Sequence, residues 1–530
     1  MTANQAWFLG IDLGTSSCKC ALIDNQSNLL ALVNVPYPGT ASKTDWKTQN
    51  PESIYRGLIQ AVQRGVDQAG VSPRQCQAVS IGCALHGLLA LDAQGNPLTP
   101  IMTWADDRAA AQAAAVAGTP QGRDLYRQTG CPPHGMYPLY KIRWLQDQQS
   151  ALFNQAARLV SVKEYLIARL TGEFLVDYSL ASGTGLLDIH RLKWHSGALR
   201  AAGIGEGHLS PLAGPGTRLK INQADFLEKT GLPPDLPLVL GSSDAVNSNL
   251  GAGAVHPTQA TCMIGTSGAY RILAPEPILS PDASTWCYCL DEQHWLVGGA
   301  INNGGLSLAW FKDMLESWPE ANPEITIPGL LALAEQSPAG SLGLICLPLF
   351  SGERSPGWNL QARGTFFGLS MEHDLRHLSR SLLEGIGYRL RILDETLRAI
   401  SGDINEVRAS GGFTRSCFWT QLTCDILNRP LSVPRIGDTS AFGAALWALL
   451  GVDEKLTLQE LGSRAALETH YHPQPEQVKL YDQIYPLTKQ LYTAVNPLFS
   501  AVHELRDWNP DPPPRPTGLN YPRSLSGCRL

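Results

Sequence analysis

The 530-residue chain lacks the features that would place it in a membrane or outside the cell. No apolar run approaches the roughly 20 residues of a membrane span. The first residues have neither the basic nor the apolar region of a signal peptide and lead directly into an expected strand. The 12 cysteines show no paired CxxC motif and no zinc-ligand spacing with histidine, which favours reduced thiols. Together these absences predict a cytoplasmic protein.

Strong charge of one sign and the familiar kinase signatures are also absent. The 41 basic and 47 acidic residues give a formal net charge of −6, which calls for neither nucleic acid nor a membrane surface as partner. The chain has no Gly-x-x-x-x-Gly-Lys-Ser/Thr motif and no His-Arg-Asp or Asp-Phe-Gly pattern. P-loop enzymes and protein kinases are therefore excluded. The length exceeds one hydrophobic core and fits two large domains.

An apolar strand that turns at glycine into hydroxyl residues occurs twice, at residues 8–17 and 262–268. Backbone N–H and side-chain O–H groups in such turns can surround a phosphate, which makes both turns candidate nucleotide contacts. The first candidate loop contains Thr15, Ser16 and Ser17, and the second contains Gly265, Thr266 and Ser267. Asp12 precedes the first loop, where a carboxylate could hold a phosphate-bound Mg²⁺ through water.

The order of expected elements is similar in the two halves. The patterns predict strands at 7–12, 18–24, 29–35 and 79–83 with a helix at 51–69, then strands at 259–264, 269–273 and 295–299 with helices at 306–315 and 375–400. This organisation predicts an α/β protein with two duplicated domains, 1–252 and 253–495, mixed sheets flanked by helices, and a ligand in the cleft between the domains. Residues 496–530, rich in proline toward the end, are expected to form a flexible tail.

Asp244 follows an apolar strand in Gly241-Ser242-Ser243-Asp244 and is a candidate general base for phosphoryl transfer. The alternative is a helix N-cap. The Gly411-Gly412 turn before Ser416 could admit a flat adenine ring, although most such pairs are simple turns.

Four further residues, His86, Trp104, Asp106 and Asp107, combine an aromatic face with polar groups in the way a sugar site does. A single histidine after an apolar strand is nevertheless more often structural.

These motifs resemble the FGGY carbohydrate kinases, a family of the actin, hexokinase and heat-shock ATPase superfamily. Residues 136–145 resemble the first family signature and residues 364–384 the second, and the resemblance spans about 6–495. It implies two actin/hexokinase-like (ribonuclease H-like) domains that bind ATP and Mg²⁺, and it allows a homodimer.

The resemblance also implies individual roles. Asp12 would organise Mg²⁺ and Asp244 would be the general base, while the two hydroxyl loops would hold the phosphates. Other positions are implied by group: nucleotide contacts at Gly305, Ala309, Gly412 and Ser416, and sugar contacts at His86, Trp104 and Asp106.

Several stretches, among them 84–87, 103–108, 161–165 and 177–185, are most similar to the gluconate kinases of the family. This similarity implies transfer of phosphate from ATP to the terminal hydroxyl of D-gluconate. A site for a sugar acid should supply a cation or N–H donors for the carboxylate. Lys141, Lys163 and Arg108 are the candidate cations, although each could equally be structural. Three alternatives remain: a kinase for D-xylulose or a related pentulose, a nucleotide-dependent binding protein without sugar turnover, and a structural filament protein of the actin type. The two family signatures argue against the third.

Overall fold

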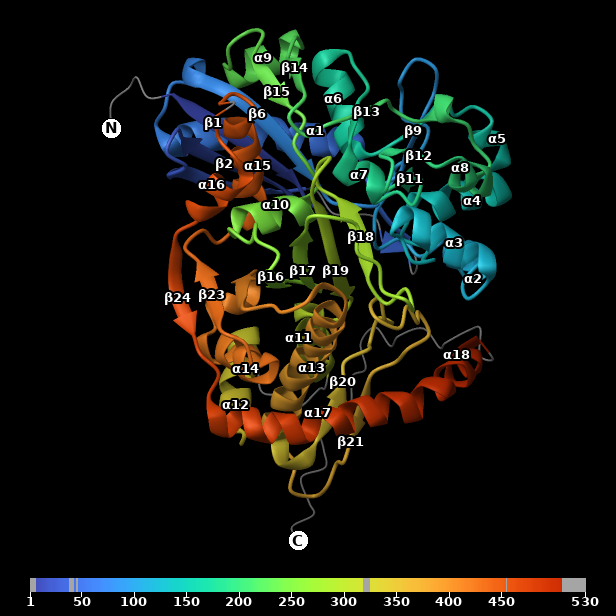
Figure 1. The fold of residues 1–530 in the computed structure, drawn as a ribbon, viewed down its shortest axis with the longest axis vertical. Coiled ribbons are helices and arrows are strands. Elements are labelled where there is room, and N and C mark those ends of the chain that lie inside the picture. Colours follow the sequence, from blue (N-terminus) through green and yellow to red (C-terminus); the bar gives the residue numbers. More distant parts are fainter. Residues whose placement is uncertain (1–5, 38–41, 44–45, 318–324, 454, 508–530) are drawn as a thin grey trace, which may run out of the picture.

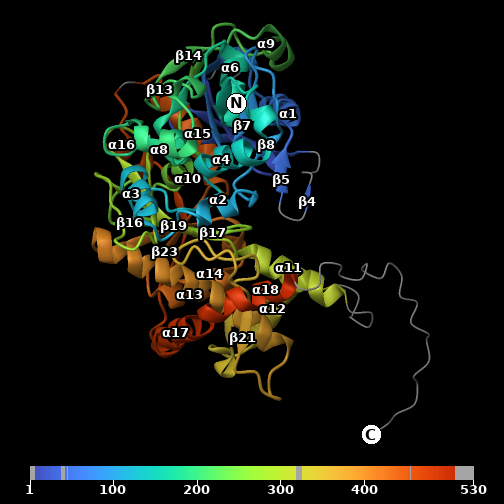
Figure 2. The same cartoon turned by 90° about the vertical axis from the view of Figure 1, so that its right-hand side faces the viewer.

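The computed structural model describes residues 6–37, 42–43, 46–317, 325–453 and 455–507, which form two α/β bodies stacked along the long axis (Figures 1 and 2). The first body is built on a six-stranded sheet in the order β14-β15-β6-β1-β2-β3. Its strands are β1 (Trp7–Leu13), β2 (Ser17–Asp24), β3 (Leu29–Pro36), β6 (Cys76–Cys83), β14 (Arg218–Lys220) and β15 (Pro237–Val239). Every residue of β1 is buried, as expected of an apolar strand inside a covered sheet.

The second body is built on a seven-stranded sheet in the order β18-β19-β17-β16-β22-β23-β24. Its strands are β16 (Gln259–Ile264), β17 (Gly268–Ala274), β18 (Trp286–Cys289), β19 (Trp295–Ile301), β22 (Glu406–Ser410), β23 (Leu431–Pro434) and β24 (Leu467–Tyr471). The series β3-β2-β1-β6-β15-β14 of the first sheet corresponds to the series β19-β17-β16-β22-β23-β24 of the second. In each series the first two pairings are antiparallel, the next two are parallel and the last is antiparallel. The predicted duplication is therefore confirmed.

The remaining strands of the described structure are short and lie outside the two large sheets. They are β4 (Ser42–Lys43), β5 (Trp46–Gln49), β7 (Leu89–Leu91), β8 (Ile101–Met102), β9 (Arg158–Val160), β10 (Val176–Asp177), β11 (Leu187–Asp188), β12 (Lys193–Trp194), β13 (Leu212–Ala213), β20 (Ile345–Leu347) and β21 (Thr365–Phe367).

Helices cover both sheets. In the first half they are α1 (Pro51–Ala69), α2 (Ala110–Ala114), α3 (Pro120–Thr129), α4 (Pro138–Gln148), α5 (Ser150–Phe153), α6 (Val162–Thr171), α7 (Tyr178–Ser182), α8 (Ser196–Ala202), α9 (Ala224–Thr230) and α10 (Asp244–Gly251). In the second half they are α11 (Gly305–Glu316), α12 (Ile327–Gln336), α13 (Leu375–Ser401), α14 (Cys417–Leu427), α15 (Thr439–Leu450), α16 (Leu458–Ser463), α17 (Pro475–Val495) and α18 (Phe499–Asp507). Among the described residues, no helix is both long and apolar enough to cross a membrane.

The predicted elements are confirmed, and most are one to three residues longer than expected. Helix α1 begins as predicted, because the Asn50 side chain accepts hydrogen bonds from the N–H groups of Glu52 and Ser53. Strand β18 was not predicted, since its sequence Trp-Cys-Tyr-Cys is a short, fully buried run without alternation.

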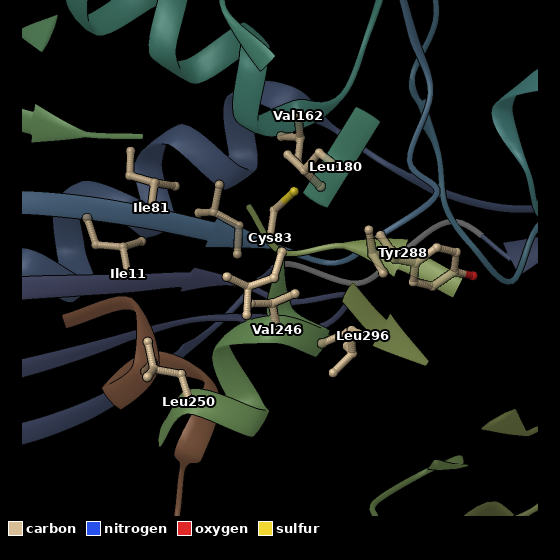
Figure 3. Packing of buried hydrophobic residues seen from close by; sticks show 14 of the residues in the cluster. Ile11, Ile81, Cys83, Val162, Leu180, Val246, Leu250, Tyr288 and Leu296 are labelled. Carbon is tan, nitrogen blue, oxygen red and sulfur yellow. The ribbon is translucent and has the colours of Figure 1, made fainter. Parts of the chain in front are cut away.

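Helix α15 belongs to the second half of the sequence but lies beside β1 and β2 in the first body (Figure 1). Gly10 makes this approach feasible, because a Cβ there would lie 2.0 Å from the backbone nitrogen of Ala445. The labelled side chains of Figure 3 likewise join the halves: Ile11 of β1 and Val246 of α10 belong to the same buried cluster as Tyr288 of β18. The apolar core is thus continuous between the two halves.

The folded chain extends further than the expected tail boundary at 496. Helix α18 lies within that tail, and Phe499 is buried in a small core with Leu347 and Leu491. Apolar packing therefore keeps residues 496–507 in the folded structure. Residues 508–530, which include the proline-rich part, lie outside the described residues.

Candidate active site

Three candidate site segments follow three neighbouring parallel strands of the first sheet. Strand β6 pairs with β1 on one side, where Leu13 lies opposite Cys83, and with β15 on the other. The first hydroxyl loop, His86 and Asp244 come directly after the carboxyl ends of β1, β6 and β15, respectively. Because parallel strands end at a common edge, these segments are brought together there, the usual position for ligands in open α/β sheets.

The first hydroxyl loop is the turn between β1 and β2. The Gly14 N–H donates to the Ser17 carbonyl at 3.0 Å, and Ser16 at the tip is exposed. The Trp104 indole N–H donates to Thr15 Oγ1 at 2.9 Å. A predicted sugar contact and a predicted phosphate contact are therefore directly joined.

Asp12 lies at the end of β1 and is almost fully buried. Its Oδ2 is 3.7 Å from Lys19 Nζ, and the same ammonium group lies 2.7 Å from Asp438 Oδ2. Burial raises the pKa of Asp12 to about 7; Lys19 opposes this rise, whereas the Asp438 and Asp244 carboxylates add to it.

The surroundings of Asp12 fit a hydrated Mg²⁺. Asp12 Oδ1 has no hydrogen-bond partner among the described residues. The described part of the chain also contains no cluster of three or more His, Cys, Asp or Glu residues suited to a metal. One carboxylate supplemented by water and substrate phosphates is the arrangement that Mg²⁺ commonly adopts.

Asp244 is the first residue of α10 and is half-buried. Ser243 caps the helix in its place, since its hydroxyl accepts from the Val246 N–H. The N-cap alternative for Asp244 is therefore wrong. Burial raises the pKa of Asp244, and the positive charge of Arg271 opposes this rise.

The turn before Asp244 is held by buried polar groups from other elements. Lys163 Nζ lies 2.7 Å from Asp177 Oδ2 and 3.4 Å from the Ser242 carbonyl oxygen, and both charged side chains are fully buried. The Ser179 hydroxyl donates to Ser243 Oγ at 2.6 Å. The Lys163 ammonium group is thus engaged within the protein, so its predicted substrate contact stays a prediction that this geometry disfavours.

Trp447 links this turn to the second half of the sequence. Its indole N–H donates to Ser242 Oγ at 2.9 Å, and the Ser242 hydroxyl donates to Asn247 Oδ1 at 2.7 Å. Helix α15 thus takes part in fixing the residues before Asp244.

The ammonium group of Lys141 is also bound within the protein. Its Nζ donates to the carbonyls of Thr103, His86 and Met102 at 2.6, 2.8 and 3.4 Å, and the side chain is fully buried. Burial lowers the pKa of this lysine to about 7. All three donor positions of the ammonium group are occupied, so the geometry also disfavours direct substrate contact by Lys141.

His86 is nearly buried and has a positive φ of 68°. Its Nδ1 lies 2.7 Å from the Gly183 carbonyl oxygen, which requires a proton on Nδ1 and leaves Nε2 as an acceptor. Tyr288, from the second half, places its hydroxyl 3.5 Å from that Nε2 and 3.0 Å from the hydroxyl of Tyr137. Burial lowers the pKa of His86 to about 3, so the imidazole is neutral at physiological pH.

Asp106 is fully buried beside Trp104 in sequence and pairs with Arg108. Asp106 Oδ1 accepts from Arg108 Nε at 2.8 Å, and Oδ2 lies 2.7 Å from Arg108 Nη2. The Arg108 guanidinium also lies over the Trp144 ring. The charge of Arg108 is therefore largely balanced by its neighbour.

The second hydroxyl loop joins β16 and β17, the position equivalent to the first loop. The start of α11 packs against it, with the Gly305 N–H donating to the Gly265 carbonyl at 2.7 Å and the Leu306 N–H donating to the Thr266 carbonyl at 3.0 Å. A Cβ on Gly305 would lie 2.8 Å from that Gly265 oxygen. Ala309 follows one turn later in α11 and is half-buried.

The Gly-Gly turn lies at the same edge of the second sheet, because β16 and β22 are parallel and Met263 lies opposite Ser410. Gly411 has a φ of 98°, and its Cβ would lie 2.5 Å from the Ile264 carbonyl oxygen, whereas a Cβ on Gly412 would meet open space. Ser416 caps α14 by accepting from the Trp419 N–H. The described residues therefore leave room beside Gly412, where the adenine contact was predicted.

Sequence reasoning missed four charged or polar side chains of this region: Lys19, Arg271, His134 and Arg354. Arg271 and Arg354 are nearly buried, and the signal for Arg271 is a single charge inside the otherwise apolar strand β17. No local pattern singles out His134 or Arg354, because their importance arises from long-range neighbours.

Two duplicated α/β domains with a hydroxyl loop at the same position in each define the actin/hexokinase-like fold class. The chain matches the FGGY family of carbohydrate kinases, with its N-terminal domain at residues 7–251 and its C-terminal domain at residues 260–452. It therefore belongs to this family and is an ATP-dependent carbohydrate kinase.

Similar proteins include both gluconate and xylulose kinases. Gluconokinase of Bacillus subtilis (strain 168) is 33% identical over 91% of this chain and 94% of its own length. The crystal structure of gluconate kinase from Lactobacillus acidophilus is 30% identical, with a TM-score of 0.86 over 93% of this chain and 98% of that one. The ligand-bound xylulose kinase from the same organism is also 30% identical, with a TM-score of 0.88 over 94% of this chain and 100% of that one.

Proposed function

We propose that the chain phosphorylates the terminal hydroxyl of D-gluconate with ATP, giving 6-phospho-D-gluconate and ADP. The convergence of Asp12, Asp244 and the first hydroxyl loop at one sheet edge is the observation that carries the phosphoryl-transfer chemistry. The similarity to gluconokinase of B. subtilis along almost the whole chain supports gluconate as the acceptor.

The phosphates of ATP are held between the loops at 15–17 and 265–267, with the adenine beside Gly412 and Ser416. Both loops offer backbone N–H and hydroxyl donors, which suit the charge of a phosphate chain. Asp12 would hold Mg²⁺ through water, and the bound ion would neutralise part of the phosphate charge.

The sugar acid lies against His86, Trp104 and Asp106, with its terminal hydroxyl toward Asp244. As the hydroxyl oxygen attacks the γ-phosphorus, Asp244 accepts the hydroxyl proton and the bond from phosphorus to the ADP oxygen breaks. The elevated pKa of Asp244 makes it a stronger base than an exposed aspartate.

The role of Asp244 is tested by Asp244→Asn. We expect the variant to fold and bind ATP normally but to lose turnover by about 10²-fold or more, because the amide cannot accept the proton. Asp147→Asn, on the surface of α4, is the matched control and should keep full activity. Near-normal turnover in Asp244→Asn would remove this residue from the role of base.

D-xylulose is the second candidate substrate, favoured by the similarity to the xylulose kinase from L. acidophilus. An ADP-release assay with MgATP across D-gluconate, D-xylulose, L-ribulose and glycerol separates the candidates. A kcat/KM for gluconate at least tenfold above the others supports the proposal. Preference for a ketose would keep the kinase chemistry and reject gluconate, and ATP-dependent binding without turnover of any sugar would favour a binding protein.

A further inference from the structure

Arg354 is a buried cation without an ion-pair partner among the described residues. It lies in the loop after β20, is 8% exposed, and its guanidinium is 4.9 Å from the centre of the Trp104 ring. Nη2 donates to the Ile301 carbonyl at 3.1 Å, whereas Nε has no hydrogen-bond partner in the described structure. Burial lowers the pKa of Arg354 to about 10, so the side chain keeps its charge at neutral pH.

His134 is a second buried donor of this kind and is 4% exposed. Its Nδ1 accepts from the Met136 N–H at 3.2 Å, so the proton of the neutral ring is on Nε2. That Nε2 has no acceptor among the described residues. The His134 ring packs against the Trp358 ring, with 5.5 Å between the ring centroids, and the Trp358 backbone N–H donates to the Arg354 carbonyl. His134 therefore lies against the loop that carries Arg354, and burial and the positive charge of Arg354 both lower the pKa of His134.

Several neighbouring polar groups already have partners, whereas Arg271 also has an Nε without a hydrogen-bond partner among the described residues. The Tyr137 hydroxyl bonds to Tyr288, Tyr288 faces His86, and His86 bonds to Gly183. Lys141 is bound to three carbonyls. What remains is the Arg354 guanidinium over the Trp104 ring and the His134 imidazole against Trp358, and both donors are buried.

Buried donors without acceptors are costly and rare, so such a pair indicates a ligand that supplies the acceptors. The positive charge of one donor calls for an anion. A cationic donor over an aromatic ring, with a second donor on the neighbouring loop, suits a planar carboxylate attached to an aliphatic chain, since the ring can pack against the chain's C–H groups.

We propose that Arg354 and His134 form the subsite for the carboxylate of the substrate, while Trp104 packs against its carbon chain. This inference rests on the proposed function and explains how a sugar acid is distinguished from a neutral sugar. His134 and Trp104 come from the first half of the sequence and Arg354 from the second. The carboxylate would therefore contact residues from both halves of the sequence.

Calorimetric binding and steady-state kinetics test this subsite with three ligands: D-gluconate, D-glucitol, in which CH₂OH replaces the carboxylate, and D-xylulose. For Arg354→Gln we expect gluconate affinity and kcat/KM to fall roughly 10- to 100-fold, the effect of losing a charge-assisted hydrogen bond. Binding of the two neutral ligands should change less than about threefold, because neither carries a negative charge for the guanidinium to bind. Arg354→Lys keeps the charge, so its gluconate affinity and kcat/KM should lie between those of the wild type and Arg354→Gln.

His134→Gln retains an N–H donor and should lose less than His134→Phe, which retains none. Arg376→Gln removes an exposed arginine at the start of α13 and controls for the change in net charge. Thermal melting of each variant shows whether it folds. If Arg354→Gln does not fold, the gluconate affinities of Arg354→Lys and the two His134 variants test the subsite in its place.

Equal losses for gluconate and the neutral ligands would overturn the subsite and assign Arg354 a packing role, as would unchanged gluconate affinity. If the variants turn over gluconate at the wild-type rate, the subsite is rejected but the proposed substrate stands. A wild-type enzyme that uses only a ketose would reject both the subsite and the proposed substrate.

Discussion

Replacing Lys163 with methionine tests whether this residue supports the Asp244 turn or contacts the substrate. The ammonium group lies 2.7 Å from Asp177 Oδ2, and both side chains are fully buried. Methionine keeps much of the length but no charge, so the Asp177 carboxylate would remain buried without a counter-charge. Loss of one partner of a buried pair typically costs about 3–5 kcal/mol of unfolding free energy.

A double variant, Lys163→Met/Asp177→Asn, separates loss of the charge balance from loss of the lysine itself. Asparagine can still cap α7, as Asp177 does by accepting from the Leu180 N–H at 3.0 Å. We expect the double variant to regain about 2 kcal/mol relative to Lys163→Met, as coupled neighbours do. Lys229→Met is the matched control, since Lys229 and Asp225 also lie 2.7 Å apart but are about half exposed. Its cost should stay below about 1 kcal/mol.

Urea unfolding and steady-state kinetics provide the two measurements. Because Lys163 also donates to the Ser242 carbonyl, its loss should loosen the turn before Asp244 and lower kcat more than it changes the KM for the sugar. The opposite pattern would refute the reasoning: a double variant with wild-type stability and kcat but a KM for the sugar raised about tenfold. Lys163 would then contact the substrate directly, and the rise in KM would correspond to the loss of one charge-assisted hydrogen bond from its ammonium group.

Two further predictions concern His134 and Trp104. Burial lowers the pKa of His134 from 6.5 to about 3, so between these values the unfolded chain takes up a proton that the folded protein does not. Unfolding free energy should therefore fall as the pH drops from 7 to 5, with about 2 kcal/mol of that fall due to His134; His134→Gln should remove this part, and identical pH dependence in the variant and wild type would contradict it. Trp104→Phe deletes the hydrogen bond to Thr15 while keeping an aromatic face, and should reduce kcat/KM for the sugar by about 3- to 10-fold; an unchanged value would show that this link does not matter for turnover.

The sequence reveals the local features because local chemistry causes them. A glycine followed by hydroxyl residues between two apolar strands specifies a hairpin turn, and both predicted turns are present between β1 and β2 and between β16 and β17. Asn50 followed by Pro51 likewise specifies the start of α1. Two such turns in equivalent surroundings were enough to predict a duplicated α/β fold.

The roles of the buried charges could not be read in the same way. Lys141 and Lys163 are indistinguishable in sequence from substrate-binding lysines, yet the structure gives Lys141 three carbonyl acceptors and Lys163 a carboxylate. Arg354 and His134 carry no motif, and Arg354 Nε and His134 Nε2 are left without acceptors among the described residues. Whether a charge is balanced depends on which distant residues pack around it.

The sequence by itself determined the strands, turns and caps, the duplicated architecture and the positions of the acid and hydroxyl residues of the loops. Only the tertiary structure decided that α15 joins the first body, that the charges of Lys141 and Lys163 are engaged inside the protein, and that Arg354 meets Trp104. The physical reason is range: a turn or a cap is fixed by residues within one helical turn, whereas burial and charge balance are fixed by residues hundreds of positions apart.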